Sequence, residues 1–405
     1  MTPILRRFTS PHDTIPRTHL LSNGRYSVMV TTAGSGYSHW RQHAVTRWRE
    51  DVTCDPWGSF LYVRDTSTGS VWSPGYQPAG READSYEVSF SEDQATFTRR
   101  DGAITTGLTV MVSAEDDAEI RRVSLTNLGS RPRELELTSY QELVLAPQAA
   151  DVAHPAFQNL FVQTEYDAET GALLATRRPR SNNEERVWAA HVATVEEHAD
   201  GVIQYETDRA RFLGRGRSVR SAVSVTDGRP LSNSVGAVLD PIFSVRRRVV
   251  VEPGETMHAT FATMVTESRE HVIDLADKYR TPATFERARI LAWTQAQVQL
   301  HHLGIDSGEA QLFQRLANRI LYSDPSLRAP QNVLAANRRG APGLWPHGIS
   351  GDLPIVVVRI DELDDVDIVR QTLRAHEYWR LKGLDVDLVI VNEHGATYAE
   401  ELHGS

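Results

Sequence analysis

The feature that most constrains the fold is a long series of short apolar or alternating runs, which extends from about residue 20 to residue 266. Each run, such as 58–63, 108–112 or 247–251, has the length of a strand. Turn dipeptides of the Asn-Gly, Asp-Gly and Pro-Gly types separate many of these runs, and such pairs favour hairpins. Many short strands at this spacing predict a large antiparallel β-sandwich.

The hydrophobic period changes after residue 266, where helical spacing begins. Ser268 is a suitable N-cap for a helix over 269–279. Pro282 can open a second helix, which Gly304 would end. A domain boundary is therefore expected near residue 266, with helices following the sandwich.

The chain beyond these helices mixes both types of element. Asp306 begins a third predicted helix, because Glu309 follows it at the spacing of a capping box. The pattern then predicts a buried strand over 354–358, a helix over 364–382 and another strand over 386–391. The fold class expected from the whole chain is thus α+β.

The composition excludes several classes of function. Hydrophobic residues make up 40% of the 405 residues and charged residues 24%, as in folded globular proteins. The formal net charge of -10 would repel a polynucleotide, so no nucleic acid partner is expected. The single cysteine, Cys54, cannot build a disulfide framework or a cysteine zinc site, and neither a metal nor a nucleotide is predicted. We find no signal peptide and no membrane segment in the sequence, and expect a cytoplasmic location.

Several motifs resemble those of glycoside hydrolase family 94, in particular its cyclic β-1,2-glucan synthase type. They are distributed along essentially the whole chain. The matching stretches are residues 21–29, 34–38, 46–51, 55–58, 139–143, 154–157, 205–209, 236–241, 344–354 and 378–384.

The resemblance implies a fold and an activity. Residues 1–266 would form a galactose-mutarotase-like supersandwich, and residues 267–405 a helical linker and the first segment of an (α/α)6 barrel. Family members cleave β-glucosidic bonds with inorganic phosphate as the co-substrate, without another cofactor. The full-length synthase type would be associated with the inner membrane.

The resemblance also implies that this chain lacks the catalytic acid. Inverting phosphorolysis needs one carboxylic acid to protonate the leaving oxygen, and the family places this acid in a Trp-Asn-Asp-like motif that does not occur here. Twelve barrel helices of about 11–12 residues need far more than the roughly 140 residues after the boundary. We therefore expect no catalytic residue in this chain, and either a longer protein or a partner that completes it.

The best candidate for sugar binding is the loop around Asp352. The resemblance implies that this carboxylate grips sugar hydroxyls, and charged groups form the stronger hydrogen bonds. Trp345 could offer an apolar ring face and His347 a second hydrogen-bonding group. The alternative is a simple turn before the following strand, with Trp345 in the core.

A second candidate group combines aromatic and charged residues near the N-terminus. Tyr37, Trp48 and Arg49 are the members predicted to contact a saccharide, and in family 94 dimers the N-terminal domain reaches toward the neighbouring subunit. The alternative is a structural sandwich edge, in which Arg47 or Arg49 pairs with Glu50 or Asp51 and the tryptophans pack.

These observations predict a carbohydrate-active protein. It would take part in glucosyl transfer between a β-1,2-glucan and phosphate or another acceptor, as an incomplete part of such an enzyme. The expected partners are a β-linked glucan or oligosaccharide and either a second copy of the chain or the remainder of a split enzyme. The alternative is a non-catalytic module that binds glucan or mediates dimerisation.

Overall fold

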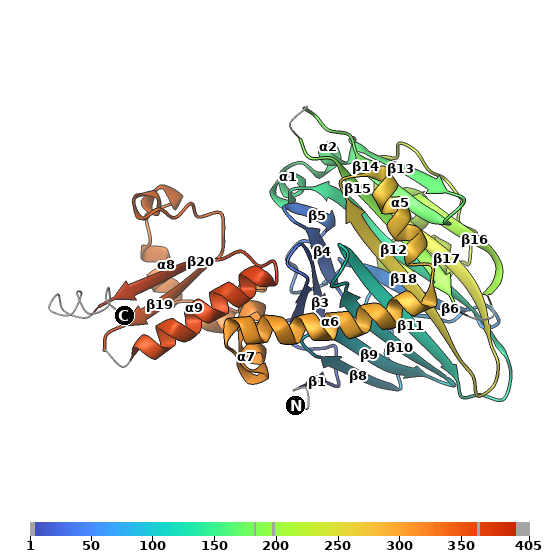
Figure 1. Ribbon diagram of the computed structural model, residues 1–405, viewed down its shortest axis with the longest axis horizontal. Coiled ribbons are helices and arrows are strands. Elements are labelled where there is room, and N and C mark those ends of the chain that lie inside the picture. The colour runs from blue at the N-terminus through green and yellow to red at the C-terminus, as the bar shows by residue number, and fades with distance from the viewer. Residues whose placement is uncertain (1–4, 182–183, 197–198, 363–364, 394–405) are drawn as a thin grey trace.

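Two large antiparallel sheets face each other, as the sequence predicts, and helices follow them in the chain (Figure 1). This computed structural model describes residues 5–181, 184–196, 199–362 and 365–393. Each sheet has nine strands among the described residues. The predicted sandwich is thereby confirmed.

The first sheet is a continuous antiparallel array. Asp101 and Gly102 connect two neighbouring strands, and the positive φ of Gly102 (60°) suits this tight turn. In spatial order its strands are β1 (Arg6–Phe8), β8 (Ser85–Phe90), β9 (Gln94–Asp101), β10 (Ile104–Val112), β11 (Ala118–Asn127), β18 (Thr256–Thr266), β15 (Val187–Val195), β14 (Ala172–Arg177) and β13 (Val162–Asp167).

The second sheet divides along its longest strand, β12. One half of β12 pairs with β6 and the other half with β5, and the register shifts between Leu143 and Ala146, where Leu145 has a positive φ of 52°. The spatial order is β16 (Ala199–Asp208), β17 (Pro241–Val251), β12 (Arg133–Ala146), β5 (His43–Thr46), β4 (Gly36–Trp40), β3 (Tyr26–Thr31) and β2 (Thr18–Ser22), with β6 (Phe60–Asp65) and β7 (Val71–Trp72) alongside.

The main core fills the space between the sheets, and a second core covers the outer face of the first sheet. Alternate residues of β11 point to opposite faces, so that Val123 enters the main core and Ile120 the outer one. Two helices cover this outer face, α5 (Arg269–Lys278) and the first half of α6 (Pro282–Leu303). The predicted N-cap is confirmed, because the Ser268 hydroxyl accepts a hydrogen bond from the His271 backbone at 3.3 Å.

Short helices occupy the loops of the sandwich and the segment after α7. They are α1 (Gln148–Ala153), α2 (Pro155–Asn159), α3 (Arg209–Leu213), α4 (Val223–Thr226) and α8 (Gln331–Ala336). Among the described helices, none combines the length and the apolar character that crossing a bilayer requires.

A third core joins the second sheet to α7 (Ser307–Leu321) and α9 (Val366–Leu381). Within it, the side chain of Gln314 on α7 bonds the backbone of the edge strand β2. Its Oε1 accepts from the Leu20 N–H at 3.0 Å and its Nε2 donates to the Leu20 carbonyl at 2.9 Å. One turn further along α7, Asn318 Oδ1 accepts from the Thr18 N–H. A helix thus supplies the hydrogen bonds that another strand would otherwise make.

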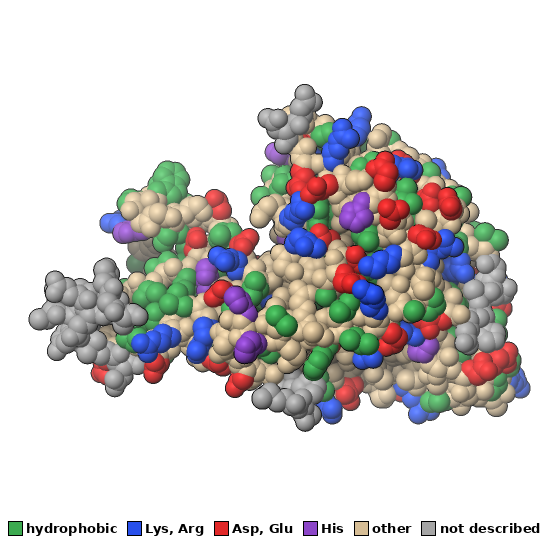
Figure 2. All heavy atoms as spheres, viewed as in Figure 1, with side chains coloured by type: hydrophobic (Ala, Val, Ile, Leu, Met, Phe, Trp, Pro, Cys, Tyr) green, Lys and Arg blue, Asp and Glu red, His purple; other side chains and the backbone are tan. Residues whose placement is uncertain are grey.

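The C-terminal part contains two parallel strands, β19 (Ile355–Ile360) and β20 (Asp387–Asn392), connected through α9. The strand predicted over 354–358 is confirmed as β19, but the prediction that it is buried is wrong, because 55% of Val357 is exposed. Only one face of this pair is covered by α9, and hydrophobic side chains gather on the visible surface of this part (Figure 2). The boundary near residue 266 and the start of a helical barrel stay predictions.

Replacement of Gln314 by alanine is expected to lower the free energy of unfolding by about 3 kcal/mol. The Leu20 N–H and C=O groups would lose their partners in a buried junction, at roughly 1–3 kcal/mol each. Urea denaturation followed by circular dichroism measures this. The matched control is Gln297→Ala on the exposed side of α6, for which a change within about 0.5 kcal/mol is expected. Equal effects of the two substitutions would contradict the bridging function of Gln314.

Candidate functional site

The predicted sugar-binding loop is held together by Ser350. The indole Nε1 of Trp345 donates to the Ser350 carbonyl at 3.3 Å, and the backbone N–H of Asp352 donates to the Ser350 hydroxyl at 3.1 Å. Two glycines with positive φ, Gly348 (73°) and Gly351 (85°), allow the chain to turn tightly around this serine. A single residue therefore holds both the indole of Trp345 and the backbone of Asp352.

The side chains of this loop are open to solvent. Trp345 is 61% exposed, so the alternative that places it in the core is wrong. Asp352 and His347 are also exposed, and their side chains form no hydrogen bond or ion pair with any residue that the structure describes. In Figure 2 the segment that carries α8 is separated from the sandwich by an open notch. The loop thus presents an apolar ring face, a carboxylate and an imidazole that are all available to a ligand.

The second predicted group lies in the junction between the sandwich and α7. Trp48 packs edge-on against Tyr37 (5.4 Å between ring centroids) and against Tyr322 (5.9 Å), which follows α7. Tyr37 is buried and Trp48 half-buried. Arg49 donates from Nη2 to the carboxylate of Asp151 at 3.2 Å. No hydrogen bond, ion pair or ring contact within the described chain joins these residues to the loop around Asp352, and their predicted contact with a saccharide is untested.

Asp55 belongs to the same junction, and sequence reasoning missed its importance. Its carboxylate accepts from the hydroxyls of Tyr322 at 2.9 Å and Thr31 at 3.1 Å. Burial raises the pKa of Asp55 to about 6, although these hydrogen bonds act in the opposite direction. The available signal was the stretch Asp55 to Gly58, which the sequence analysis used only as a family motif.

A buried ionic network surrounds Glu142 on β12. Its carboxylate accepts from Arg47 Nη1 at 3.0 Å, from Arg209 Nε at 2.7 Å and from the Tyr140 hydroxyl at 2.7 Å. Arg47 also pairs with Asp151 at 3.0 Å. The structural alternative from the sequence analysis paired Arg47 with Glu50 or Asp51. The observed partners of Arg47 are instead Glu142 and Asp151, which are distant from it in the chain. The network connects α1 to the sandwich and has no free charge to offer a ligand.

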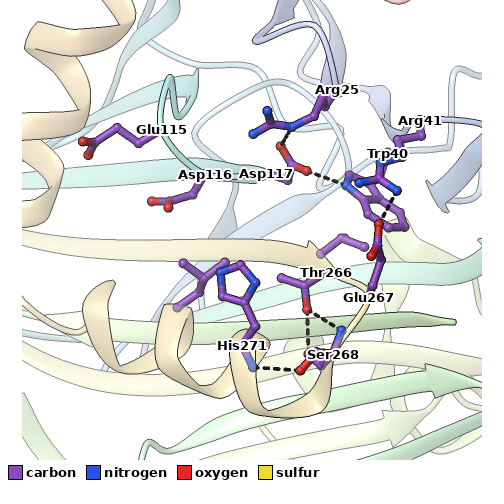
Figure 3. Close-up of a pocket in the computed structure, with 12 residues that line it drawn as sticks. Arg25, Trp40, Arg41, Glu115, Asp116, Asp117, Thr266, Glu267, Ser268 and His271 are labelled. Atoms are coloured by element: carbon purple, nitrogen blue, oxygen red, sulfur yellow. Dashed lines mark hydrogen bonds and ion pairs between the residues drawn. The ribbon is translucent and has the colours of Figure 1, made fainter.

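A cavity of about 410 Å³ lies between the sandwich and the start of α5 (Figure 3). Figure 3 shows Asp117 between Arg25 and Trp40, and it accepts from Arg25 Nε at 2.8 Å and from Trp40 Nε1 at 2.7 Å. Arg41 covers the ring of Trp40 at 4.5 Å and pairs with Glu267. Because these charges are paired and the indole is buried, the cavity offers a saccharide less than the open loop around Asp352.

We expect the contribution of Asp55 to the stability of the protein to fall as the pH rises from about 4 to 6. A carboxyl group whose pKa is raised by folding binds its proton more tightly in the folded protein than in the unfolded chain. Its protonation therefore adds to the free energy of unfolding at low pH, and this addition is lost when the pH rises through the folded-state pKa. Asp55→Asn removes this dependence and keeps a residue type that tolerates the positive φ of 44° at this position. Relative to the wild type, the variant should gain on the order of 1–2 kcal/mol between pH 4.5 and 7.5.

Urea titrations across this pH range provide the measurement. Asp51→Asn is the control, because hydrogen bonds, first from the Thr53 hydroxyl, lower the pKa of Asp51. Asp51 is therefore deprotonated in the folded and the unfolded protein over this range, and the stability curve of this variant should run parallel to that of the wild type. Parallel stability curves for the wild type and Asp55→Asn would show that Asp55 does not titrate as described.

Replacement of Glu142 by alanine is expected to lower the free energy of unfolding by about 3–5 kcal/mol, because it leaves the buried guanidinium of Arg47 with one carboxylate fewer. Glu134→Ala on the same strand is the control. Glu134 pairs with Arg248 at 3.0 Å at the surface, where an ion pair contributes about 1 kcal/mol or less. Similar losses in chemical denaturation for both variants would rule out the special importance of the buried network.

Comparisons with known proteins agree with this architecture. The glycosyl hydrolase 94 supersandwich domain matches residues 2–282. The cyclic beta-(1,2)-glucan synthase NdvB of Rhizobium meliloti (strain 1021) is 40% identical over 402 residues, which are 99% of this chain and 14% of that protein. A solabiose phosphorylase of Paenibacillus borealis is 30% identical over 59% of this chain and 30% of its own length. An N,N'-diacetylchitobiose phosphorylase of Vibrio furnissii is 26% identical over 67% of this chain and 33% of its own length.

The chain thus spans about a third or less of the length of each of these relatives. The matched region includes both sheets of the sandwich and α5, and it exceeds half of the chain. The chain therefore belongs to the glycosyl hydrolase 94 family through its supersandwich domain.

Proposed function

We propose that the chain contributes a glucan-binding surface to an enzyme that transfers glucosyl units between a β-1,2-glucan and inorganic phosphate or another acceptor. The likeness to a protein named as a cyclic beta-(1,2)-glucan synthase, which covers 99% of this chain, supports the choice of glucan. The relatives named as phosphorylases support phosphate as the co-substrate. The exposed free thiol of Cys54 agrees with a cytoplasmic setting.

The observation that carries the proposal is the arrangement around Ser350. Sugar rings have apolar faces and polar edges, so they bind well where an aromatic face lies next to hydrogen-bonding groups. The exposed Trp345 and Asp352 provide this combination, and the hydrogen bonds to Ser350 from the Trp345 indole and the Asp352 backbone reduce the ordering of the loop that binding requires. His347, in the same loop, adds a neighbouring donor or acceptor.

The acid that protonates the leaving oxygen is proposed to come from outside this chain. No Trp-Asn-Asp sequence occurs among its 405 residues. In this arrangement the chain would hold the glucan, while the longer protein or a second, different chain would cleave it. A non-catalytic glucan-binding or dimerisation module is the alternative. Release of glucose 1-phosphate from β-1,2-glucooligosaccharides by this chain alone would contradict both assignments.

Calorimetric titration with β-1,2-glucooligosaccharides tests the binding site. Trp345→Ala and Asp352→Asn are each expected to weaken binding by about tenfold or more, because each removes one of the contacts that fix the sugar. Trp293→Ala is the matched control, since Trp293 is also exposed (51%) but lies on α6 outside the loop. Unchanged affinity in both loop variants, or an equal loss in Trp293→Ala, would refute a sugar site at this loop.

A further inference from the structure

Five arginine side chains line one cavity where β1, the start of β2 and α7 meet. Arg6 and Arg7 belong to β1, Arg17 precedes β2, and Arg315 and Arg319 belong to α7. Figure 1 shows β1 and α7 near the N-terminal end of the chain. The cavity has a volume of about 310 Å³. Like charges placed together in this way repel each other unless other groups compensate them.

Nearby carboxylates compensate only part of this charge. Arg17 has a partner in Asp13, at 3.5 Å, and Arg319 pairs with Asp324. Arg17 and Asp13 are both partly exposed to solvent, so the attraction between them is weak. Three of the five guanidinium groups are left without a carboxylate at ion-pair distance within the described chain.

The remaining arginines differ in burial. Arg7 and Arg315 are exposed and form no hydrogen bond or ion pair with the residues that the structure describes. Arg6 is largely buried, and its Nε has no hydrogen-bond partner there. Burial lowers the pKa of Arg6 to about 10; Glu92 opposes this change and Arg315 adds to it. The cavity therefore combines an excess of positive charge with a buried donor that has no acceptor.

Asn318 provides an independent indication of an absent acceptor. It lines the same cavity and is only 3% exposed. Its Oδ1 accepts from the Thr18 N–H, which can only donate, so the orientation of the amide is fixed. The other polar atom of this amide, Nδ2, is a buried hydrogen-bond donor that has no partner among the described residues. A buried donor without an acceptor is costly, and a ligand that supplies oxygen atoms would remove that cost.

We propose that this arginine pocket binds the phosphate group of a small phosphorylated molecule. Guanidinium groups match phosphate oxygens in geometry and charge, and several of them suit a dianion better than a singly charged carboxylate. The volume exceeds the needs of a bare phosphate, and the ring of Phe8 on the cavity wall offers an apolar surface for an attached sugar. Both free phosphate and a sugar phosphate supply the required chemistry.

This pocket is separate from the loop around Asp352 and uses none of its residues. The inference does not depend on the proposed function, because it follows from the charges and the buried donors alone. A phosphorylated ligand here would bridge β1 and α7, and so would strengthen the contact between the sandwich and the helices that follow it.

Calorimetric titration of the whole chain with inorganic phosphate and with glucose 1-phosphate, at constant chloride concentration, tests the proposal. The double variant Arg7→Gln, Arg315→Gln removes two exposed, unpaired charges, so it is expected to fold normally. It should weaken binding by at least about tenfold. The matched control is Arg131→Gln with Arg215→Gln, two exposed arginines outside the cavity, for which unchanged binding is expected.

Binding that is lost only in the first double variant supports the pocket. Tighter binding of glucose 1-phosphate than of phosphate would identify a sugar phosphate as the ligand, and equal binding would identify free phosphate. The absence of binding by the wild type at millimolar concentrations of both compounds would overturn the proposal. Equal affinities of the two double variants would also overturn it, because the binding would then lie elsewhere.

Discussion

The apolar outer face of the first sheet is the constraint on which the rest of the molecule depends. Residues such as Ile120, Leu174 and Met264 cannot remain exposed in water, so the chain must cover them as soon as the last strand is complete. Helix α5 and the first half of α6 provide this cover. With 22 residues, α6 is about 33 Å long and extends beyond the sheet. Its far end therefore determines where α7 and α9 meet the second sheet.

The features predicted from the sequence are those with local causes. The series of strands follows from alternation and turn residues, and the helix starting after Ser268 follows from its side-chain cap. Gly304, which ends α6 with a φ of 61°, is equally local. The burial of β19 was mispredicted for a related reason. An apolar strand has the same pattern whether a second layer covers it or not, and the exposure of Val357 depends on that layer.

The candidate site also combines residues that are close together in the sequence with residues whose partners are distant in the chain. The loop around Asp352 was singled out through its resemblance to the family, in a motif whose residues lie within eight positions of one another, and its binding of sugar stays a prediction. The partners of Arg47 could not, because Glu142 and Asp151 are 95 and 104 residues away and a local pairing satisfied the same chemistry. Asp55 and Tyr322 are 267 residues apart, so only the folded chain reveals that they share a hydrogen bond. Charged residues in a sequence indicate that partners exist without identifying them.

The hydrogen bonds from Gln314 and Asn318 to β2 bear on how this protein avoids aggregation. An edge strand with free backbone groups is a template on which a strand of another molecule can assemble. Here two amide side chains, one helical turn apart, occupy the outward-facing groups of Thr18 and Leu20. A helix cannot extend a sheet further, so α7 terminates the array and prevents intermolecular β-sheet growth from that side of the sandwich.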